Sequence, residues 1–498
     1  MASQNTLNTY DAYSRITEFK GLNQYGDGID SDARYATECE NMETFGGVLQ
    51  PAAACVLLPP QLEQPIETLM RLYRRWYTGG EDKTYLIAAS GGKLYAMHPD
   101  DTAWTEIEMP EGVTAFESNV WSWVTYEVND VGSEAPTDVL LISNAVDGMF
   151  LVRGDTLKVT VVDAPKKFGV IERYAERIWG GASPDDPDIL TYSAPFDPTD
   201  WIAVADDPAA GAGDVQQPSW DGDSFTALKA FGQQLIAFKK TRVWRVSNTD
   251  PSEYVFKEQY GGGTPFPNTI AVDVERIFML DRRGVSVYDG LSVTEYQHDW
   301  VNKVYARMNQ NALDQACACL WHGKYYLAIP IDGSATNNAV LIYDQNEATW
   351  LLRTDACVEA FLPTDECLYF TSTQTPGKVW KWSEDSWASG SVNSAKTLWV
   401  MPWNDLRYKN VLCGNFTVYL LAETQAGGAE IRITLQTERR KVTKTIRLSQ
   451  EYRNGQEPKQ LAVPFPIYGR RFRLIIESEN CLWRINSGVM ITSDIAED

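Results

Sequence analysis

The stretch that decides the fold is residues 221–246, DGDSFTALKAFGQQLIAFKKTRVWRV. It contains two apolar runs, LIAF at 235–238 and VWRV at 243–246, with a charged turn at 239–242 between them. Short apolar runs on both sides of a polar turn predict two antiparallel strands joined as a hairpin. A single hairpin is only marginally stable in water, so this one needs neighbouring sheets to cover its faces.

The same pattern recurs along most of the chain. The other hairpins are expected at 85–88 with 93–96, 139–142 with 149–152, 177–179 with 189–192, 277–280 with 285–288, 325–329 with 340–343, and 367–370 with 378–381. Their starts lie roughly 40 to 55 residues apart, which is typical of propeller blades. No WD or kelch signature repeats at fixed offsets. The pattern therefore predicts an all-β fold with a β-propeller of six to seven blades.

Three regions are expected. Residues 1–65 carry no blade pattern and predict an extended N-terminal arm that packs with the C-terminal domain; residues 66–385 form the propeller. Residues 62–77 fit a helix or a strand equally well, and the arginines within them favour a solvated edge. Residues 386–498 begin with a polar linker and continue with strands of period two at 416–421, 430–435, 444–448, 471–476 and 482–486, which predict a β-sandwich. Asn454 and Gly455 suit a tight turn.

The formal net charge is −23, and the charge is unevenly distributed. Of 44 basic and 67 acidic residues, 15 and 11 respectively lie in residues 395–498, so the rest of the chain is very acidic. Tight binding to nucleic acid needs clustered Lys and Arg, and this composition disfavours it. The sequence shows no secretory signal and no apolar run of about 20 residues, so no membrane span is expected.

No cofactor, metal or catalytic site is expected. The eight cysteines are scattered and predict buried, reduced thiols. Asp27, Asp30 and Asp32 do not fit a calcium loop, because Ile29 stands at its third position and Asp32 at its glycine position. The three histidines, His98, His298 and His322, lie in different blade regions, which disfavours histidine-based catalysis. The acidic segments 185–188 and 197–201 are punctuated by proline and predict Asx-turns.

Both ends of the chain resemble a known family. The arm motifs KGLNQ at 20–24, NM at 41–42 and GGVLQP at 46–51 are similar to the opening of tail hub and nozzle proteins of short-tailed bacteriophages, the packaged-DNA stabilisation proteins. Residues 91–95, 235–246 and 340–344 resemble that family's propeller strands, and 469–476 its basic C-terminal strand. One departure is Gln50, which stands where a typical arm has a basic residue before its proline.

The resemblance implies a structural protein and no enzyme: a subunit of a homohexameric tail ring. Such a ring attaches below the portal or head–tail adaptor, extends and closes the DNA channel, retains packaged DNA and lets it pass on ejection without tight binding. Tail fibre, needle or plug proteins are further implied partners. The protein would be located in the virion tail after assembly in the host cytoplasm.

The residues assigned on this basis form three groups. The arm motif for assembly comprises Gly21, Asn23, Asn41, Gly47 and Pro51. The basic C-terminal strand for ring contact comprises Arg470, Arg471 and Arg473. The acidic loop that could line the channel comprises Asp185, Asp186 and Asp188.

The alternative is a carbohydrate-binding or depolymerising propeller of a phage tail. Tyr343 and Asp344 followed by Trp350 resemble part of the Asp box of sialidases, although its Ser and Gly are absent. Aromatic residues clustered on the axial face of the propeller would favour this alternative. A generic interaction scaffold, which would be monomeric, is a third possibility.

Overall fold

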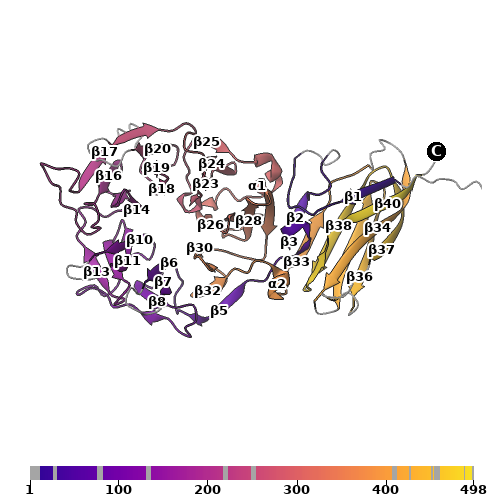
Figure 1. The fold of residues 1–498 in the computed structure, drawn as a ribbon, viewed down its shortest axis with the longest axis horizontal. Coiled ribbons are helices and arrows are strands. Elements are labelled where there is room, and N and C mark those ends of the chain that lie inside the picture. Colours follow the sequence, from indigo (N-terminus) through magenta and orange to yellow (C-terminus); the bar gives the residue numbers. More distant parts are fainter. Residues whose placement is uncertain are drawn as a thin grey trace, which may run out of the picture.

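The computed structural model describes residues 12–25, 31–75, 82–129, 136–216, 223–247, 254–405, 412–425, 428–449, 453, 460–486 and 488–495. Two parts lie side by side in Figure 1: a ring of radial sheets seen down its axis, and a two-layered set of long strands next to it. The fold is all-β, with a propeller, a C-terminal β-sandwich and an N-terminal arm, as the sequence predicts.

The described residues form seven blades of four strands each. Blade one consists of β6 (Thr68–Arg74), β7 (Lys83–Ser90), β8 (Lys93–Met97) and β9 (Thr105–Glu106). Blade two consists of β10 (Ser122–Val128), β11 (Thr137–Asn144), β12 (Gly148–Arg153) and β13 (Val159–Val162). Blade three consists of β14 (Val170–Tyr174), β15 (Arg177–Gly181), β16 (Ile189–Tyr192) and β17 (Gly213–Gln216). Blade four consists of β18 (Ala227–Phe231), β19 (Gln234–Phe238), β20 (Val243–Ser247) and β21 (Val255–Glu258). Blade five consists of β22 (Ala271–Val272), β23 (Ile277–Leu280), β24 (Val285–Tyr288) and β25 (Val293–Glu295). Blade six is β26 (Cys317–Trp321), β27 (Lys324–Ile329), β28 (Ala339–Asp344) and β29 (Thr349–Arg353); blade seven is β30 (Ala360–Pro363), β31 (Leu368–Thr371), β32 (Lys378–Lys381) and β5 (Val56–Gln61).

Each predicted hairpin forms the second and third strands of one blade. In β19 and β20, Leu235 pairs with Val246 and Phe238 with Val243, and all four side chains are buried. Neighbouring blades cover both faces of these middle strands, so the strands are apolar throughout. A separate apolar cluster lies between blades seven and one, and others lie between blades one and two, two and three, three and four, and four and five.

The seventh blade is closed by a strand from the N-terminal region. β5 pairs antiparallel with β32 as the outermost strand, and it contains Pro59 and Pro60. Prolines are tolerated at a sheet edge because no ladder hydrogen bond is needed on the outer side. The expected boundary at residue 65 therefore lies after a strand of the propeller. The helix considered for residues 62–77 is wrong over the described part, because β6 is a strand.

The C-terminal sandwich has two facing sheets. One contains β1 (Ala12–Ile16), β40 (Val489–Ile495), β34 (Cys413–Thr424) and β37 (Gln460–Gly469), with β39 (Trp483–Ile485) paired to β34. The other contains β33 (Lys396–Val400), β38 (Phe472–Glu479), β35 (Ala429–Thr437) and β36 (Lys441–Leu448). β1 pairs with β40 along its length, so part of the N-terminal region is a strand of the sandwich (Figure 1).

The propeller and the sandwich share one sheet. β2 (Glu38–Glu40) pairs in parallel with β29 of blade six and antiparallel with β33 of the sandwich, which produces a nine-stranded sheet. One apolar cluster runs from blades five and six through Phe19, Leu22 and Met42 of the arm to the sandwich core. A continuous sheet and a continuous core join the two parts as one packed body.

The remaining elements are short. They are β3 (Met42–Glu43), β4 (Gln50–Pro51), α1 (Asn302–Tyr305), α2 (Ser386–Ser389) and the 3-10 turns η1 (Phe45–Gly47), η3 (Pro267–Thr269), η4 (His298–Trp300) and η5 (Leu313–Gln315). In the part of the chain that is described, no helix is long and apolar enough to cross a membrane. The turn predicted at Asn454 and Gly455 lies outside the described residues.

Candidate functional site

The five arm-motif residues lie in the region between blade six and the sandwich, called here the arm junction. Gly21 lies against blade six: its N–H donates to Thr349 Oγ1 at 2.8 Å, and Leu22 N–H donates to the Trp350 carbonyl at 2.7 Å. A Cβ atom at residue 21 would lie 2.0 Å from the Trp350 carbonyl oxygen. Only glycine permits so close an approach between the two backbones.

Asn23 continues this contact within the arm. Its N–H donates to the Ala36 carbonyl at 2.8 Å, and its Oδ1 accepts from Tyr25 N–H at 3.1 Å. The neighbouring Gln24 is buried, and its Oε1 accepts from Lys303 N–H at 2.9 Å. The KGLNQ motif thus anchors the arm to the propeller at α1 and β29.

Asn41 joins blade six to the start of β33. Its Nδ2 donates to Thr354 Oγ1 and to the Lys396 carbonyl, both at 2.9 Å, while its Oδ1 accepts from Thr354 N–H at 2.8 Å. Its backbone has a φ of 55°, which asparagine tolerates better than most residues. Asn41 is 2% exposed, so each of these bonds is shielded from water.

Gly47 and Pro51 complete the junction. Gly47 has a φ of 77° and its carbonyl accepts from Phe19 N–H at 2.9 Å. Pro51 is buried in β4, and its carbonyl accepts from Ser386 Oγ at 2.5 Å. The segment 383–396, expected as a polar linker, is therefore held against the arm at α2.

Gln50, which precedes Pro51 in the arm, has two acidic neighbours. Its Nε2 donates to Glu43 Oε2 and to Asp385 Oδ1, each at 3.0 Å. Burial raises the pKa of Glu43, although the charge of Arg353 opposes this shift. The neutral amide of Gln50 supplies donors to both carboxylates.

Arg353 is the main buried cation of the junction. It is 2% exposed, and its Nη2 lies 2.6 Å from Asp355 Oδ2 and 2.7 Å from the Ala53 carbonyl. Its guanidinium lies 4.9 Å from the centre of the Trp382 ring. Asn393 Nδ2 also donates to Asp355 at 2.6 Å. The network ties blade six, the arm and the segment after α2 together.

This network predicts a loss of stability in acid. Burial raises the pKa of Asp355, but the charge and hydrogen bond of Arg353 and the amide of Asn393 outweigh it, so the pKa lies below its ordinary value. A lowered pKa contributes stability that is present above the unfolded-state pKa of about 3.9 and is lost as pH falls through the folded-state pKa. The melting temperature of the wild type should therefore exceed that of Asp355→Asn above about pH 5, and the difference should shrink below about pH 4. A difference that is constant across this range would contradict the assignment.

The basic C-terminal residues lie at one end of the sandwich, called here the basic tip and defined by Arg439, Arg470 and Arg471. Glu438 connects the segment before β36 to the segment before β38, because its carboxylate accepts hydrogen bonds from the N–H groups of Arg470 at 2.8 Å and Arg471 at 3.1 Å. Arg473 differs from these: its Nε donates to Gln436 Oε1 at 3.1 Å, and its guanidinium lies 5.0 Å from the Trp403 ring centre. Arg470 and Arg471 are exposed.

Carboxylates of the acidic loop before β16 form ion pairs within the propeller. Asp186 lies 3.1 Å from Lys166, and Asp188 lies 2.8 Å from the Nζ of the fully buried Lys239. Asp185 is exposed. At least two of the three carboxylates therefore neutralise lysines of the same chain. The Asx-turns expected at 197–201 are confirmed, since Asp197 and Asp200 each accept a backbone N–H two residues ahead.

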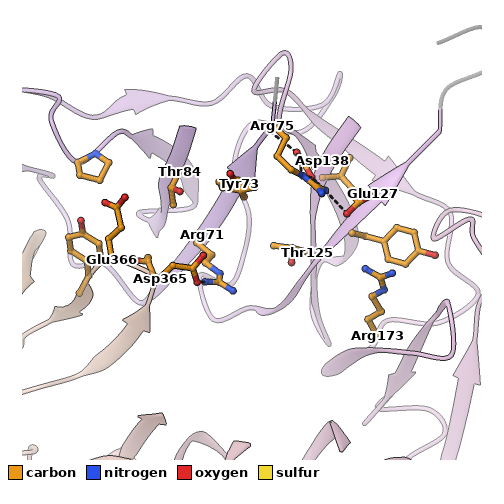
Figure 2. A pocket seen from close by; sticks show the side chains of 15 residues that line it. Arg71, Tyr73, Arg75, Thr84, Thr125, Glu127, Asp138, Arg173, Asp365 and Glu366 are labelled. Atoms are coloured by element: carbon orange, nitrogen blue, oxygen red, sulfur yellow. Dashed lines mark hydrogen bonds and ion pairs between the residues drawn. The ribbon is translucent and has the colours of Figure 1, made fainter. Parts of the chain in front are cut away.

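A second candidate site is a pocket of about 390 Å³ at the mouth of the propeller axis, called here the axial pocket. It is formed by the carboxyl-terminal halves of the innermost strands β6, β10 and β14 and by the loop after β30 (Figure 2). Its lining residues are Arg71, Tyr73, Arg75, Thr84, Pro99, Thr125, Tyr126, Glu127, Asp138, Val139, Arg173, Thr364, Asp365, Glu366 and Tyr369. Innermost strands of a propeller run in the same direction, so these strand ends converge on one face.

The three arginines of the axial pocket are held differently. Arg75 is saturated by an ion pair to Glu127 and by hydrogen bonds from its N–H and Nε to Asp138, at 2.8 and 3.0 Å (Figure 2). Arg173 lies 4.6 Å from the Tyr126 ring centre and bonds Glu176 through Nη2 at 2.9 Å. Arg71 has the weakest contacts: 3.4 Å to the Pro363 carbonyl and 3.8 Å to Asp365, which is fully exposed.

Sequence reasoning missed the axial pocket. The solvated edge expected for the arginines of residues 62–77 does not describe Arg71, which lines the pocket, and Arg173 and Asp365 carry no signal in the sequence. In β6, buried Met70 and Leu72 alternate with Arg71 and Tyr73. This alternation would locate Arg71 and Tyr73 on one face of the strand but not identify their neighbours. The pocket exists only because blades one, two, three and seven meet at the axis.

Metal ligands do not come together in the described part of the chain, where no group of three or more His, Cys, Asp or Glu side chains could hold an ion. Asp27 and Asp30 lie outside the described residues, and Asp32 pairs with Arg34 at 2.6 Å. All eight cysteines are free, and five of them are buried.

Comparison with known proteins finds only weak structural similarities. No family model and no curated protein matches the chain. Among solved structures, BamB from Moraxella catarrhalis is 10% identical, with a TM-score of 0.35 over 74% of this chain and 100% of that one. The Pan2 WD40 domain of Neurospora crassa is 10% identical, with a TM-score of 0.35 over 65% and 90%. The extracellular domain of the putative hybrid two-component system BT4673 from B. thetaiotaomicron is 11% identical, with a TM-score of 0.44 over 84% and 60%.

Proposed function

We propose that this chain is a structural subunit of the tail hub or nozzle ring of a short-tailed bacteriophage. In this role it forms a hexameric ring below the portal or adaptor, continues and closes the DNA channel, and lets DNA pass on ejection. The observation that carries the proposal is the arm junction: the motif residues on which the family resemblance rests are those that bind the sandwich to blade six. A rigid two-part subunit suits a ring that must resist the pressure of packaged DNA.

Surface chemistry also supports assembly. Exposed aromatic residues lie on the arm and on the sandwich, namely Tyr13, Tyr25, Phe45 and Tyr468. Tyrosine and phenylalanine are enriched at protein interfaces. The exposed arginines of the basic tip suit an acidic neighbouring ring, since the chain outside residues 395–498 is strongly acidic.

The acidic composition fits a channel past which DNA slides. With a net charge of −23, the average field repels phosphates, and the repulsion extends about 8 to 10 Å at physiological salt. Within the acidic loop, Asp185 is the candidate for the channel wall, because its side chain is exposed while Asp186 and Asp188 pair with lysines.

The test uses virions of the phage that encodes the chain. Antibodies raised against the recombinant protein should label the tail, and symmetry-resolved images should show a sixfold ring below the adaptor. The recombinant chain alone should give no shift of duplex DNA even at about 50 mM salt, where basic proteins bind best. Absence of the chain from purified virions, or tight salt-sensitive duplex binding, would refute the proposal.

A further inference from the structure

The axial pocket contains cationic donors that the protein leaves available. Within the described chain, Nε and Nη2 of Arg71 and Nε and Nη1 of Arg173 have no hydrogen-bond partner. Arg75, in contrast, is paired with two carboxylates. Figure 2 shows Arg71 and Arg173 on either side of Thr125 around the same opening. A planar guanidinium with free N–H groups is suited to bind a carboxylate through two parallel hydrogen bonds.

The remaining lining restricts the chemistry of the ligand. The ring of Tyr73, which is 39% exposed, provides a flat apolar surface, whereas Tyr126 and Tyr369 are buried. Thr84 and Thr125 provide hydroxyl groups. Four carboxylates also line the pocket, at Glu127, Asp138, Asp365 and Glu366, against three arginines. These acids disfavour a dense polyanion such as a phosphate chain. Asp365 and Glu366, which are exposed and do not pair with Arg75, can accept hydrogen bonds from the hydroxyl groups of a ligand whose own negative charges are few and separated.

The positions of the two arginines also restrict the ligand. Arg71 comes from blade one and Arg173 from blade three, with Thr125 of blade two between them. Because the two guanidinium groups come from different blades, a ligand with carboxylates on two neighbouring units can bind both of them. The volume of about 390 Å³ is in the range of small-molecule sites and admits a disaccharide-sized segment.

We propose that the axial pocket binds an acidic oligosaccharide with carboxylates on successive sugar residues. Arg71 and Arg173 each bind one carboxylate, the ring of Tyr73 packs against the apolar face of a sugar ring, and Thr125, Asp365 and Glu366 bind hydroxyl groups. The inference goes beyond the structural role proposed above, because it assigns the protein a ligand that a ring subunit does not require.

The test is calorimetric titration of the full chain with tetragalacturonate, with maltotetraose as the neutral analogue. Tetragalacturonate should bind with a submillimolar Kd and maltotetraose should not bind. Arg71→Gln and Arg173→Gln should each weaken binding roughly tenfold or more, because each removes one charged contact. Arg470→Gln, an equal change at the exposed basic tip, should leave the affinity unchanged. Melting curves should show that Arg71→Gln and Arg173→Gln remain folded, because the ion pairs that both side chains form are partly exposed to solvent.

Arg71→Lys and Arg173→Lys provide a second comparison. They keep the charge but lose the paired N–H geometry, so their affinities should lie between those of the wild type and the glutamine variants. Tripolyphosphate and a short polyglutamate peptide are the competing anions. The proposal is overturned if tetragalacturonate shows no binding at millimolar concentration, if both glutamine variants bind it as the wild type does, or if tripolyphosphate or the peptide binds more tightly.

Discussion

Gly21→Ala is expected to detach the N-terminal arm from blade six and to destabilise the protein by about 3–5 kcal/mol. The added Cβ would lie 2.0 Å from the Trp350 carbonyl oxygen, 2.7 Å from Thr349 Oγ1 and 2.9 Å from Leu351. Because the nearest of these atoms is backbone, a side-chain rotation cannot relieve the contact. The arm must move, and the hydrogen bonds of Gly21 and Leu22 to β29 are lost with it.

The measurement for Gly21→Ala is thermal melting together with limited proteolysis. The variant should melt at a lower temperature and be cleaved within the arm at protease concentrations that leave the wild type intact. Gly262→Ala is the matched control, since Gly262 is exposed and a Cβ there meets no atom within 4 Å. Equal melting temperatures and equal protection of the arm in Gly21→Ala would refute the importance of this contact.

Arg353→Met is expected to cost about 3–5 kcal/mol, because removing one partner of a buried ion pair leaves the other charge without compensation. The Asp355 carboxylate is 11% exposed and, among the described residues, would retain only the amide of Asn393 as a side-chain partner. The Ala53 carbonyl would lose its donor as well. Methionine keeps much of the side-chain volume against Trp382, so the loss reports charge and hydrogen bonding more than packing.

A double variant separates these causes. Arg353→Met combined with Asp355→Asn should be more stable than Arg353→Met alone, because the second change removes the unpaired charge. Arg447→Met is the surface control: Arg447 pairs with Glu430 at 2.6 Å, but its side chain is 80% exposed, so its loss should cost at most about 0.5 kcal/mol. If Arg353→Met unfolds at the same denaturant concentration as Arg447→Met, the buried network does not stabilise the junction.

The strands of the C-terminal sandwich differ in how well the sequence predicts them. β34, β35 and β38 were expected because their buried residues alternate along one face. β37 was not expected, because Pro464 and Pro466 interrupt its sequence. Both prolines are exposed and lie on the strand at the edge of its sheet, where one side of the backbone needs no partner.

The outer strands of the blades were also hard to predict. β9 and β25 have two and three residues, and most of their side chains are exposed. Such strands have too few buried positions to show a period of two. Their existence follows from the preceding strand, which offers an unpaired edge next to them.

The sequence by itself determined the middle hairpin of every blade and the all-β class, because residues buried on both faces must be apolar whatever their neighbours are. Only the tertiary structure decided that β5 closes blade seven, that β2 joins two domains in one sheet, and that Arg71 and Arg173 share a pocket. Each of these arrangements brings together residues that are distant along the chain, and a local pattern carries no information about a distant partner. Gly21 shows the difference: the sequence marks it as a motif glycine, but the Trp350 carbonyl that requires it is known only from the fold.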